Sequence, residues 1–196
     1  MDQQPCLAAF TGLLLAGALH AAEWPQYRGP NFDGSTAETI RTNWTEKPLE
    51  VVWKRSLQPG WSSPMVAGGR LITQVRGLDQ GDPREFCIAL DAATGAELWS
   101  RPLDIASYDN LVGYDDAIDG PRSSPSVVGN RVFVLTSQLK LFCLRADNGG
   151  ILWQRDFVAE FGSSVIAWQS AASPLVVGDL VFVNCNAPGR RLLAVR

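Results

Sequence analysis

The chain has 196 residues and a formal net charge of −3, from 17 basic and 20 acidic side chains. Hydrophobic residues make up 46% and charged residues 19% of it, which is typical of globular proteins and excludes disordered or collagen-like classes. The basic residues form no run or stripe, so the pattern predicts no nucleic-acid partner. The single histidine, His20, lies in a segment that we expect to be removed. Its loss excludes a Ser-His-Asp triad, a Cys-His pair and a histidine-ligated metal.

Residues 1–22 are typical of an export signal peptide. An apolar run at residues 7–18 is too short to cross a bilayer, and small-residue cleavage patterns follow at residues 16–18 and 21–22. The region before the run carries no Lys or Arg, which leaves a buried N-terminal helix as the alternative. We expect a mature protein that begins near Glu23 and is periplasmic or secreted, with no membrane insertion after cleavage. Residues 23–49 then form an N-terminal extension.

Three cysteines remain in that mature chain: Cys87, Cys143 and Cys185. Each lies in an apolar, strand-like segment, where an unpaired cysteine behaves as a small apolar residue. Export permits a structural disulfide between two of them, which is the alternative. The sequence favours buried thiols. It has no Cys-x-x-Cys motif and so supports neither a redox nor a zinc site.

Two short patterns recur along residues 50–196. The first is an apolar segment that begins with a proline, at Pro64, Pro125 and Pro174. The second centres on a tryptophan that follows apolar residues, at Trp53, Trp99 and Trp153. The prolines lie 61 and 49 residues apart, and the tryptophans 46 and 54. Such self-similarity indicates a repeat architecture with loops of varying length.

The clearest unit, residues 123–156, divides into four short strands. The first ends at Gly129-Asn130, a pair suited to a tight hairpin. The second alternates its side chains, with residues 132, 134 and 136 on one face and residues 133 and 135 on the other. A turn at residues 147–150 precedes a closing strand that runs to Phe157. The first unit has the same parts, with an insertion at residues 77–83 between its second and third strands.

Four antiparallel strands per unit, without a helical period, predict an all-β fold: a β-propeller of four-stranded antiparallel blades. A β-sandwich is the alternative, but sandwiches do not repeat one internal motif. Residues 50–196 hold one outer strand at residues 51–55, two full blades and three strands of a third, whereas propellers close with about four to eight blades. We therefore expect an incomplete N-terminal portion of about three blades that ends within a blade. A ring assembled from several short chains is the alternative.

The run from Ala89 to Trp99 resembles the tryptophan-docking motif of PQQ-like β-propeller repeat proteins, the superfamily of quinoprotein alcohol dehydrogenases and of the outer-membrane assembly lipoprotein. Residues 23–34, 120–125 and 158–174 are similar to an exported bacterial subfamily with this repeat. Within the motif we expect Asp91, Thr94 and Gly95 to form the turn between the third and fourth strands. In the second blade Arg145 stands in place of the aspartate, so we expect a turn held differently. The three repeat tryptophans are expected to fill the space between neighbouring blades.

The resemblance alone implies PQQ and calcium as possible cofactors. Quinoprotein dehydrogenases of this superfamily also use an aspartate base and often an adjacent Cys-Cys disulfide. This sequence has no Cys-Cys pair, and no position matches a calcium ligand or the base. The acidic loop at residues 104–122 lacks the residue order of a calcium-binding loop, so a solvated surface is favoured over a metal site. Its oxygen-bearing residues are Asp104, Tyr108, Asp109, Asn110, Tyr114, Asp115, Asp116 and Asp119.

Three side chains are candidates for ligand or cofactor binding at one mouth of the propeller channel. Trp61, Arg122 and Ala171 each lie three residues before a repeat proline, where the inner strands begin, and Trp168 lies on the next loop toward that mouth. Arg122 with Trp61 or Trp168 can bind a ligand that carries a carboxylate or an aromatic ring. The alternative is that Arg122 pairs with Asp119 and that the tryptophans pack on their own loops.

The sequence favours an exported, non-catalytic binding or scaffold module with a protein or polysaccharide partner. The alternative is a PQQ- and calcium-dependent dehydrogenase that oxidises an alcohol or a sugar. A glycan-cleaving enzyme needs two acids at a defined separation, and nothing here specifies such a pair. No catalytic or metal-ligating residue is assigned.

Overall fold

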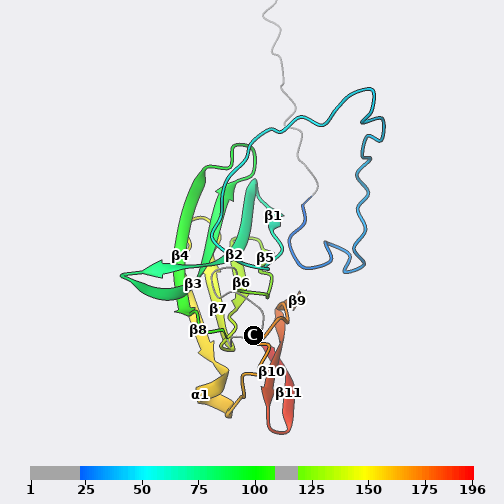
Figure 1. Cartoon of the computed structure of the whole chain (residues 1–196). Helices are drawn as coiled ribbons and strands as arrows, with labels where there is room; N and C mark the ends of the chain where they lie inside the picture. Colours follow the sequence, from blue (N-terminus) through cyan, green and yellow to red (C-terminus); the bar gives the residue numbers. More distant parts are fainter. Residues whose placement is uncertain (1–22, 109–118) are drawn as a thin grey trace, which may run out of the picture.

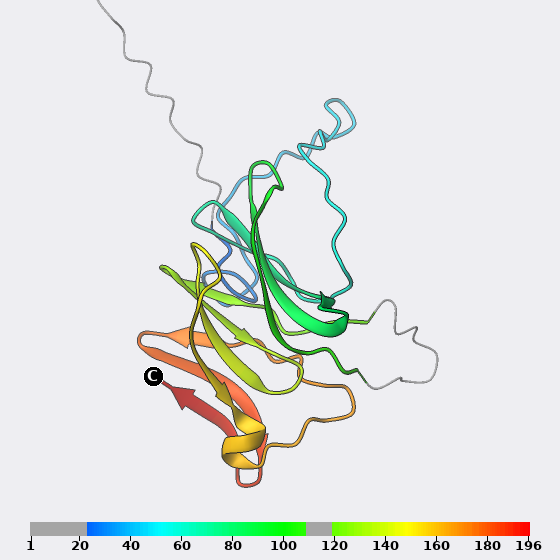
Figure 2. The same cartoon turned by 90° about the vertical axis from the view of Figure 1, so that its left-hand side faces the viewer.

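The computed structural model describes residues 23–108 and 119–196, and their strands form three antiparallel sheets that follow the chain order. Blade 1 comprises β1 (Met65–Ala67), β2 (Arg70–Asp79), β3 (Asp82–Asp91) and β4 (Glu97–Ile105). Blade 2 comprises β5 (Ser126–Val128), β6 (Arg131–Leu135), β7 (Lys140–Arg145) and β8 (Ile151–Asp156). Blade 3 comprises β9 (Leu175–Val177), β10 (Leu180–Ala187) and β11 (Arg190–Val195). Figures 1 and 2 show the sheets stacked in sequence without closing into a ring.

This architecture confirms the predicted fold class, an all-β propeller portion with four-stranded antiparallel blades. Each of the four strands predicted in residues 123–156 is present. Val128 pairs with Arg131, so Gly129 and Asn130 form the predicted two-residue hairpin turn. Within the described residues no helix is long and apolar enough to cross a membrane. The predicted signal peptide lies outside the described residues.

Three local predictions are wrong. Residues 51–55 form no strand. A strand needs a partner strand for its backbone hydrogen bonds, and in the described part of the chain no strand pairs with this segment. Residues 77–83 are not an insertion between strands, because β2 and β3 remain paired as far as Asp79 and Asp82. The closing strand of blade 2 ends at Asp156, whose side chain accepts a hydrogen bond from the Ala159 N–H (3.0 Å) and so caps the short helix α1 (Phe157–Phe161).

Strand β6 divides the core into two layers, as its alternating sequence predicts. Val132 and Val134 belong to a buried cluster that includes Ile72 of blade 1. Phe133 and Leu135 belong to a second buried cluster, which includes residues of blade 3. The central sheet is therefore apolar on both faces, and each face is buried only when a neighbouring blade covers it. Cys87, Cys143 and Cys185 are buried and unpaired, which confirms the predicted thiols.

The N-terminal extension begins against the inner strands. Trp24 pairs with Val66 of β1 through two backbone hydrogen bonds of 2.7 and 2.9 Å. The carbonyl of Pro25 accepts a hydrogen bond from the Val127 N–H of β5 (2.8 Å). Figure 1 shows this segment, in blue, beside blades 1 and 2. It therefore joins the inner edges of two blades.

The indole of Trp99 joins blade 1 to blade 2. Its Nε1 donates a hydrogen bond to the Ala146 carbonyl (2.9 Å), and the Nε of Arg101 donates to the Gly149 carbonyl (2.8 Å). Both acceptors lie in the turn between β7 and β8. Gly149 has φ +68°, and a Cβ there would lie 2.6 Å from the Trp99 ring. The turn thus needs glycine both for its left-handed backbone and for contact with the indole.

The other two repeat tryptophans differ from each other. Trp53 packs against Gly95 and donates to the Ala92 carbonyl (3.0 Å), as Trp99 does in the next blade. Trp153 is half-buried and contacts Phe133, with ring centroids 6.0 Å apart. The contacts of Trp53 and Trp99 place both rings against the turn between the third and fourth strands of the following blade.

The turns that receive these indoles are held in two ways. In blade 1 the Asp91 carboxylate accepts hydrogen bonds from the N–H and the hydroxyl of Thr94, both 2.8 Å, which lower its pKa. In blade 2 Arg145 replaces this aspartate and instead forms an ion pair with Asp147 (2.6 Å). The substitution therefore keeps the turn but changes the interaction that stabilises it, as predicted.

Replacing Gly149 with alanine tests the contact between blades. Gly149→Ala should lower the free energy of unfolding by about 2–4 kcal/mol, because backbone strain adds to a clash with the Trp99 ring. The matched control is Gly178→Ala, which has a similar φ of +61° and no heavy atom within 4 Å of the new Cβ. Gly178→Ala should lower the free energy of unfolding only by the backbone strain, about 1–2 kcal/mol. Urea denaturation measures both, and equal losses would contradict the role of the indole contact.

Candidate functional site

The structure brings the three predicted candidates, Trp61, Arg122 and Trp168, into one surface at the start of the inner strands. The backbone N–H of Trp61 donates to the Pro121 carbonyl (2.8 Å), directly before Arg122. The Nη1 of Arg122 donates to the Oε1 of Gln169 (2.9 Å), directly after Trp168. The side chains of Trp61 and Trp168 are 56% and 61% exposed. We call the surface formed by these residues the mouth surface; its members are Trp61, Pro121, Arg122, Trp168 and Gln169.

Arg122 is bound within the protein. Its Nη2 donates to both carboxylate oxygens of Asp119, each at 2.9 Å, while Nη1 is bound to Gln169. Asp119 is buried and also accepts a hydrogen bond from the Gly120 N–H (2.8 Å). The pairing of Arg122 with Asp119, the alternative considered from the sequence, is therefore present, and Trp61 and Trp168 remain largely exposed. Binding of a ligand carboxylate by Arg122 stays a prediction.

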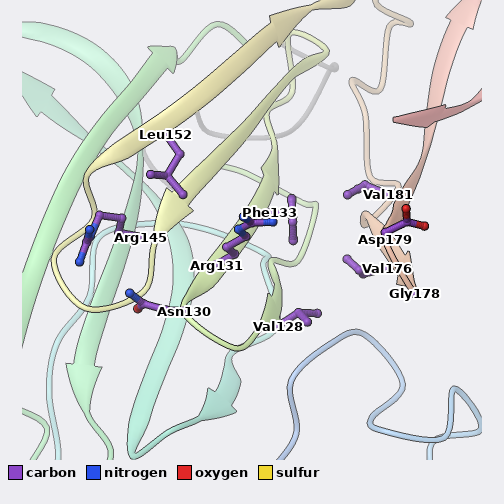
Figure 3. A pocket seen from close by; sticks show the side chains of 10 residues that line it. All are labelled: Val128, Asn130, Arg131, Phe133, Arg145, Leu152, Val176, Gly178, Asp179 and Val181. Carbon is purple, nitrogen blue, oxygen red and sulfur yellow. The ribbon is translucent and has the colours of Figure 1, made fainter. Parts of the chain in front are cut away.

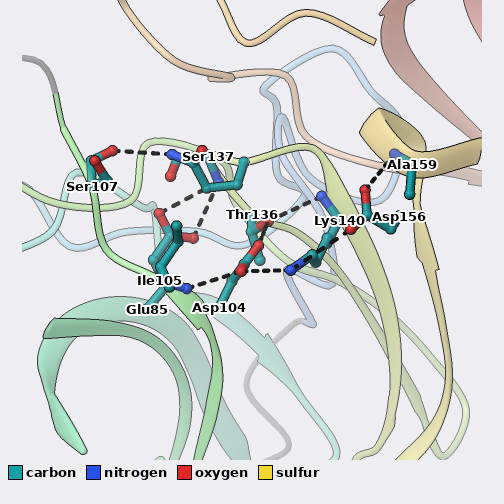
Figure 4. Close-up of polar contacts among 10 residues, drawn as sticks. Glu85, Asp104, Ile105, Ser107, Thr136, Ser137, Lys140, Asp156 and Ala159 are labelled. Atoms are coloured by element: carbon teal, nitrogen blue, oxygen red, sulfur yellow. Dashed lines mark hydrogen bonds and ion pairs between the residues drawn. The ribbon is translucent and has the colours of Figure 1, made fainter. Parts of the chain in front are cut away.

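Tyr108 connects Arg122 to a buried carboxyl group. The guanidinium carbons of Arg76 and Arg122 lie 5.8 and 6.0 Å from the Tyr108 ring centroid. The Tyr108 hydroxyl donates to the Oε1 of Glu85 (2.7 Å), and the backbone N–H of Ser137 donates to its Oε2 (3.1 Å). Figure 4 shows Glu85 between the two blades. Glu85 was not among the candidates predicted from the sequence, because β3 also carries Asp82, Arg84 and Asp91 and no local pattern singles out Glu85 as buried.

Burial raises the pKa of the Glu85 carboxyl from its ordinary value of 4.5 to about 7. Hydrogen bonds from Ser137 and Tyr108 oppose this rise, and the neighbouring Asp104 adds to it. Burial and the proximity of Glu85 also raise the pKa of the Tyr108 hydroxyl. Glu85 thus changes its charge near neutral pH at the interface between two blades.

Asp104, also shown in Figure 4, is the second buried acid at this interface. It accepts hydrogen bonds from the Thr136 hydroxyl (3.0 Å), the Lys140 ammonium group (2.9 Å) and the Ile105 N–H (2.9 Å). The expectation of a solvated acidic surface is therefore wrong for Asp104 and for Asp119, because folding pairs each with a cation. The acidic residues at positions 109–116 lie outside the described residues.

Among the described residues of this mouth, the charged groups considered for PQQ or calcium already have partners within the protein. Arg122, the residue predicted to bind a carboxylate, already binds Asp119 and Gln169. A calcium ion needs several converging oxygens, yet Asp104 and Asp119 are held by Lys140 and Arg122. In residues 23–108 and 119–196, no three His, Cys, Asp or Glu side chains are placed to hold a metal ion.

A ladder of serines positions the mouth. The Ser63 N–H donates to the hydroxyl of Ser124 (3.0 Å), and the Ser124 N–H donates to the hydroxyl of Ser173 (2.9 Å). Each of these serines directly precedes a repeat proline, so the same hydrogen bond recurs from blade to blade. The recurring Ser-Pro pair was visible in the sequence, but its role required the distances between blades.

A cavity between blades 2 and 3 is separate from the mouth surface. It measures about 360 Å³ and is lined from the β5–β6 and β9–β10 turns, whereas the mouth residues precede β5 and β9. Figure 3 shows Arg131 and Arg145 on one wall and Asp179 on the other. The two sites therefore lie at opposite ends of the inner strands.

Glu85 predicts a specific pH dependence of stability. A carboxyl whose pKa is higher in the folded than in the unfolded state contributes stability that is complete below about pH 4.5 and is lost as the pH rises through about 7. Glu85→Gln removes this titration, so the stability of the native protein relative to the variant should fall by about 3 kcal/mol between pH 5 and pH 8. Urea denaturation across this range measures the difference. Glu97→Gln, at an exposed glutamate, is the control, and a pH-independent difference for Glu85→Gln would refute the assignment.

The chain is similar to one protein family and to several solved structures. The family described as outer membrane protein assembly factor BamB matches residues 84–195, more than half of the chain. No curated protein matches the sequence. Quinohemoprotein alcohol dehydrogenase from Comamonas testosteroni is similar over 86% of this chain and 24% of its own, with 18% identity and a TM-score of 0.59. That level of identity shows the fold alone.

Two further solved structures match with lower TM-scores. BamB from Moraxella catarrhalis has 22% identity and a TM-score of 0.40, over 59% of this chain and 28% of its own. A europium-containing methanol dehydrogenase has 18% identity and a TM-score of 0.42, over 68% of this chain and 22% of its own. The chain thus spans about a quarter of the length of the structures that it matches.

Proposed function

Since the chain belongs to the family described as outer membrane protein assembly factor BamB, a family of PQQ-like β-propellers, we propose that it is a non-catalytic binding or scaffold module. The protein carries a cleaved signal peptide at residues 1–22 and works outside the cytoplasm, in the periplasm or secreted. It holds a protein or polysaccharide partner at the mouth surface. The family description names an assembly factor, which supports a role in binding rather than in catalysis.

The observation that carries this proposal is the contrast between charged and aromatic groups at the mouth. Arg122 and Asp119 neutralise each other and hold the adjoining loops through Gln169 and Gly120. The large aromatic side chains of the same surface, Trp61 and Trp168, are exposed. Exposed aromatic anchors on loops of fixed shape favour association, because little conformational freedom is lost on binding.

The test compares partner capture by the chain and by its variants. The immobilised protein is exposed to protein and polysaccharide fractions of the producing cell's envelope and medium. Trp61→Ala combined with Trp168→Ala should reduce capture by about tenfold or more, because it removes both anchors. Trp44→Ala, at a tryptophan of the N-terminal extension that is 46% exposed, is the matched control and should leave capture unchanged. Capture that survives the double substitution would contradict the proposal.

The alternative function, that of a PQQ- and calcium-dependent dehydrogenase, is tested on the same protein. PQQ is titrated with and without calcium while absorbance and thermal unfolding are followed. A binding module should show no saturable change at concentrations well above micromolar. Saturable binding with a higher melting temperature would replace the proposal with a PQQ- and calcium-dependent oxidation of an alcohol or a sugar.

A further inference from the structure

A small recess opens beside Trp168 at the mouth surface. It measures about 120 Å³ and lies under the loop between α1 and β9. Ile166 and Gln169, which flank Trp168 in the sequence, line one side, and Asn184 and Asn186 of β10 line the other. The remaining lining residues are Leu139, Ser164, Val165, Ser170, Ala171 and Ala172, and none of the ten carries a charge.

Several polar side chains of this recess are available to a ligand. Among the described residues, none donates to or accepts from the side chains of Ser164, Ser170 or Asn184. The hydroxyl of Ser163, directly before this lining, is buried without a hydrogen-bond partner. Hydroxyl and amide groups both donate and accept hydrogen bonds, so the recess matches a ligand that does the same.

The aromatic side chains beside the recess supply an apolar face. Trp168 is the third residue of a turn closed by a hydrogen bond from the Gln169 N–H to the Ile166 carbonyl (2.8 Å), and its indole is exposed there. Arg122 binds Gln169, so the surface continues to the second exposed indole, Trp61. The exposed indole of Trp168 thus belongs to the same turn as Ile166 and Gln169, which line the recess.

We propose that the mouth surface binds a neutral carbohydrate chain, with one sugar against Trp168 and its hydroxyl groups in the recess. This inference rests on the proposed function and specifies its partner. A sugar ring offers a C–H face that stacks on an indole and hydroxyl groups that match amides and serines. An apolar peptide would leave these polar groups without partners, and an anionic ligand would find no cation in the recess lining.

The size of the recess favours a chain over a free monosaccharide. At about 120 Å³ the recess is small, and in the proposed complex it takes one hydroxyl-bearing edge of a sugar ring. The rest of that ring lies on Trp168. Further sugars can then reach Trp61 across Arg122, so an oligosaccharide makes contacts that a single sugar lacks.

Calorimetric titration of the full chain tests this inference with four probes: maltohexaose, cellohexaose, chitohexaose and an anionic oligogalacturonate. At least one neutral hexasaccharide should bind saturably, and more tightly than the oligogalacturonate. Trp168→Ala should weaken that binding by about tenfold or more, and Asn184→Ala by about fivefold. Trp44→Ala, the matched control, should leave the affinity within about twofold.

The inference is overturned if no neutral hexasaccharide saturates at about 10 mM, or if Trp44→Ala weakens binding as much as Trp168→Ala. The capture experiment separates this failure from that of the proposed function. Trp168-dependent capture of an envelope protein without binding of any hexasaccharide leaves the binding module in place with a protein as its partner. Failure of both experiments removes both proposals.

Discussion

The contact between the Trp99 indole and the turn of the next blade is the interaction on which the rest of the structure depends. One buried ring fills the space between two sheets, and its N–H satisfies a carbonyl of the turn at Ala146. The close approach of the ring is possible only because Gly149 has no side chain. No blade can bury its own apolar faces, so contacts of this kind convert separate four-stranded sheets into one stack.

The mouth surface is a consequence of that stacking. Once the blades are placed, serines at the start of the inner strands bond from one blade to the next, and Glu85 of blade 1 reaches Ser137 of blade 2. The loop residue Tyr108 is then fixed between Glu85 and Arg122. The surface that we propose for binding therefore has its charges paired within the protein, and it presents aromatic side chains to the solvent.

The charges of this surface bear directly on its chemistry. Acids and bases that are paired inside the protein, such as Asp119 with Arg122 and Asp104 with Lys140, hold loops in place and have little capacity left for a metal ion or an anion. The groups that stay available are the indoles and the uncharged side chains beside them. This distribution supports the proposed binding through stacking and neutral hydrogen bonds.

The sequence by itself determined the repeat, the strands of the second blade, the hairpin at Gly129 and the burial of the three thiols, because alternation and turn chemistry act over a few neighbouring residues. It placed Trp61 and Arg122 at one mouth from their equivalent positions in the repeat, and Trp168 on the next loop toward that mouth. Only the tertiary structure decided that residues 51–55 form no strand and that Asp119 neutralises Arg122. The tertiary structure alone showed that Glu85 is buried and accepts a hydrogen bond from Tyr108. Pairing, burial and charge compensation depend on residues that are distant in the chain, and local periodicity does not specify which of them meet.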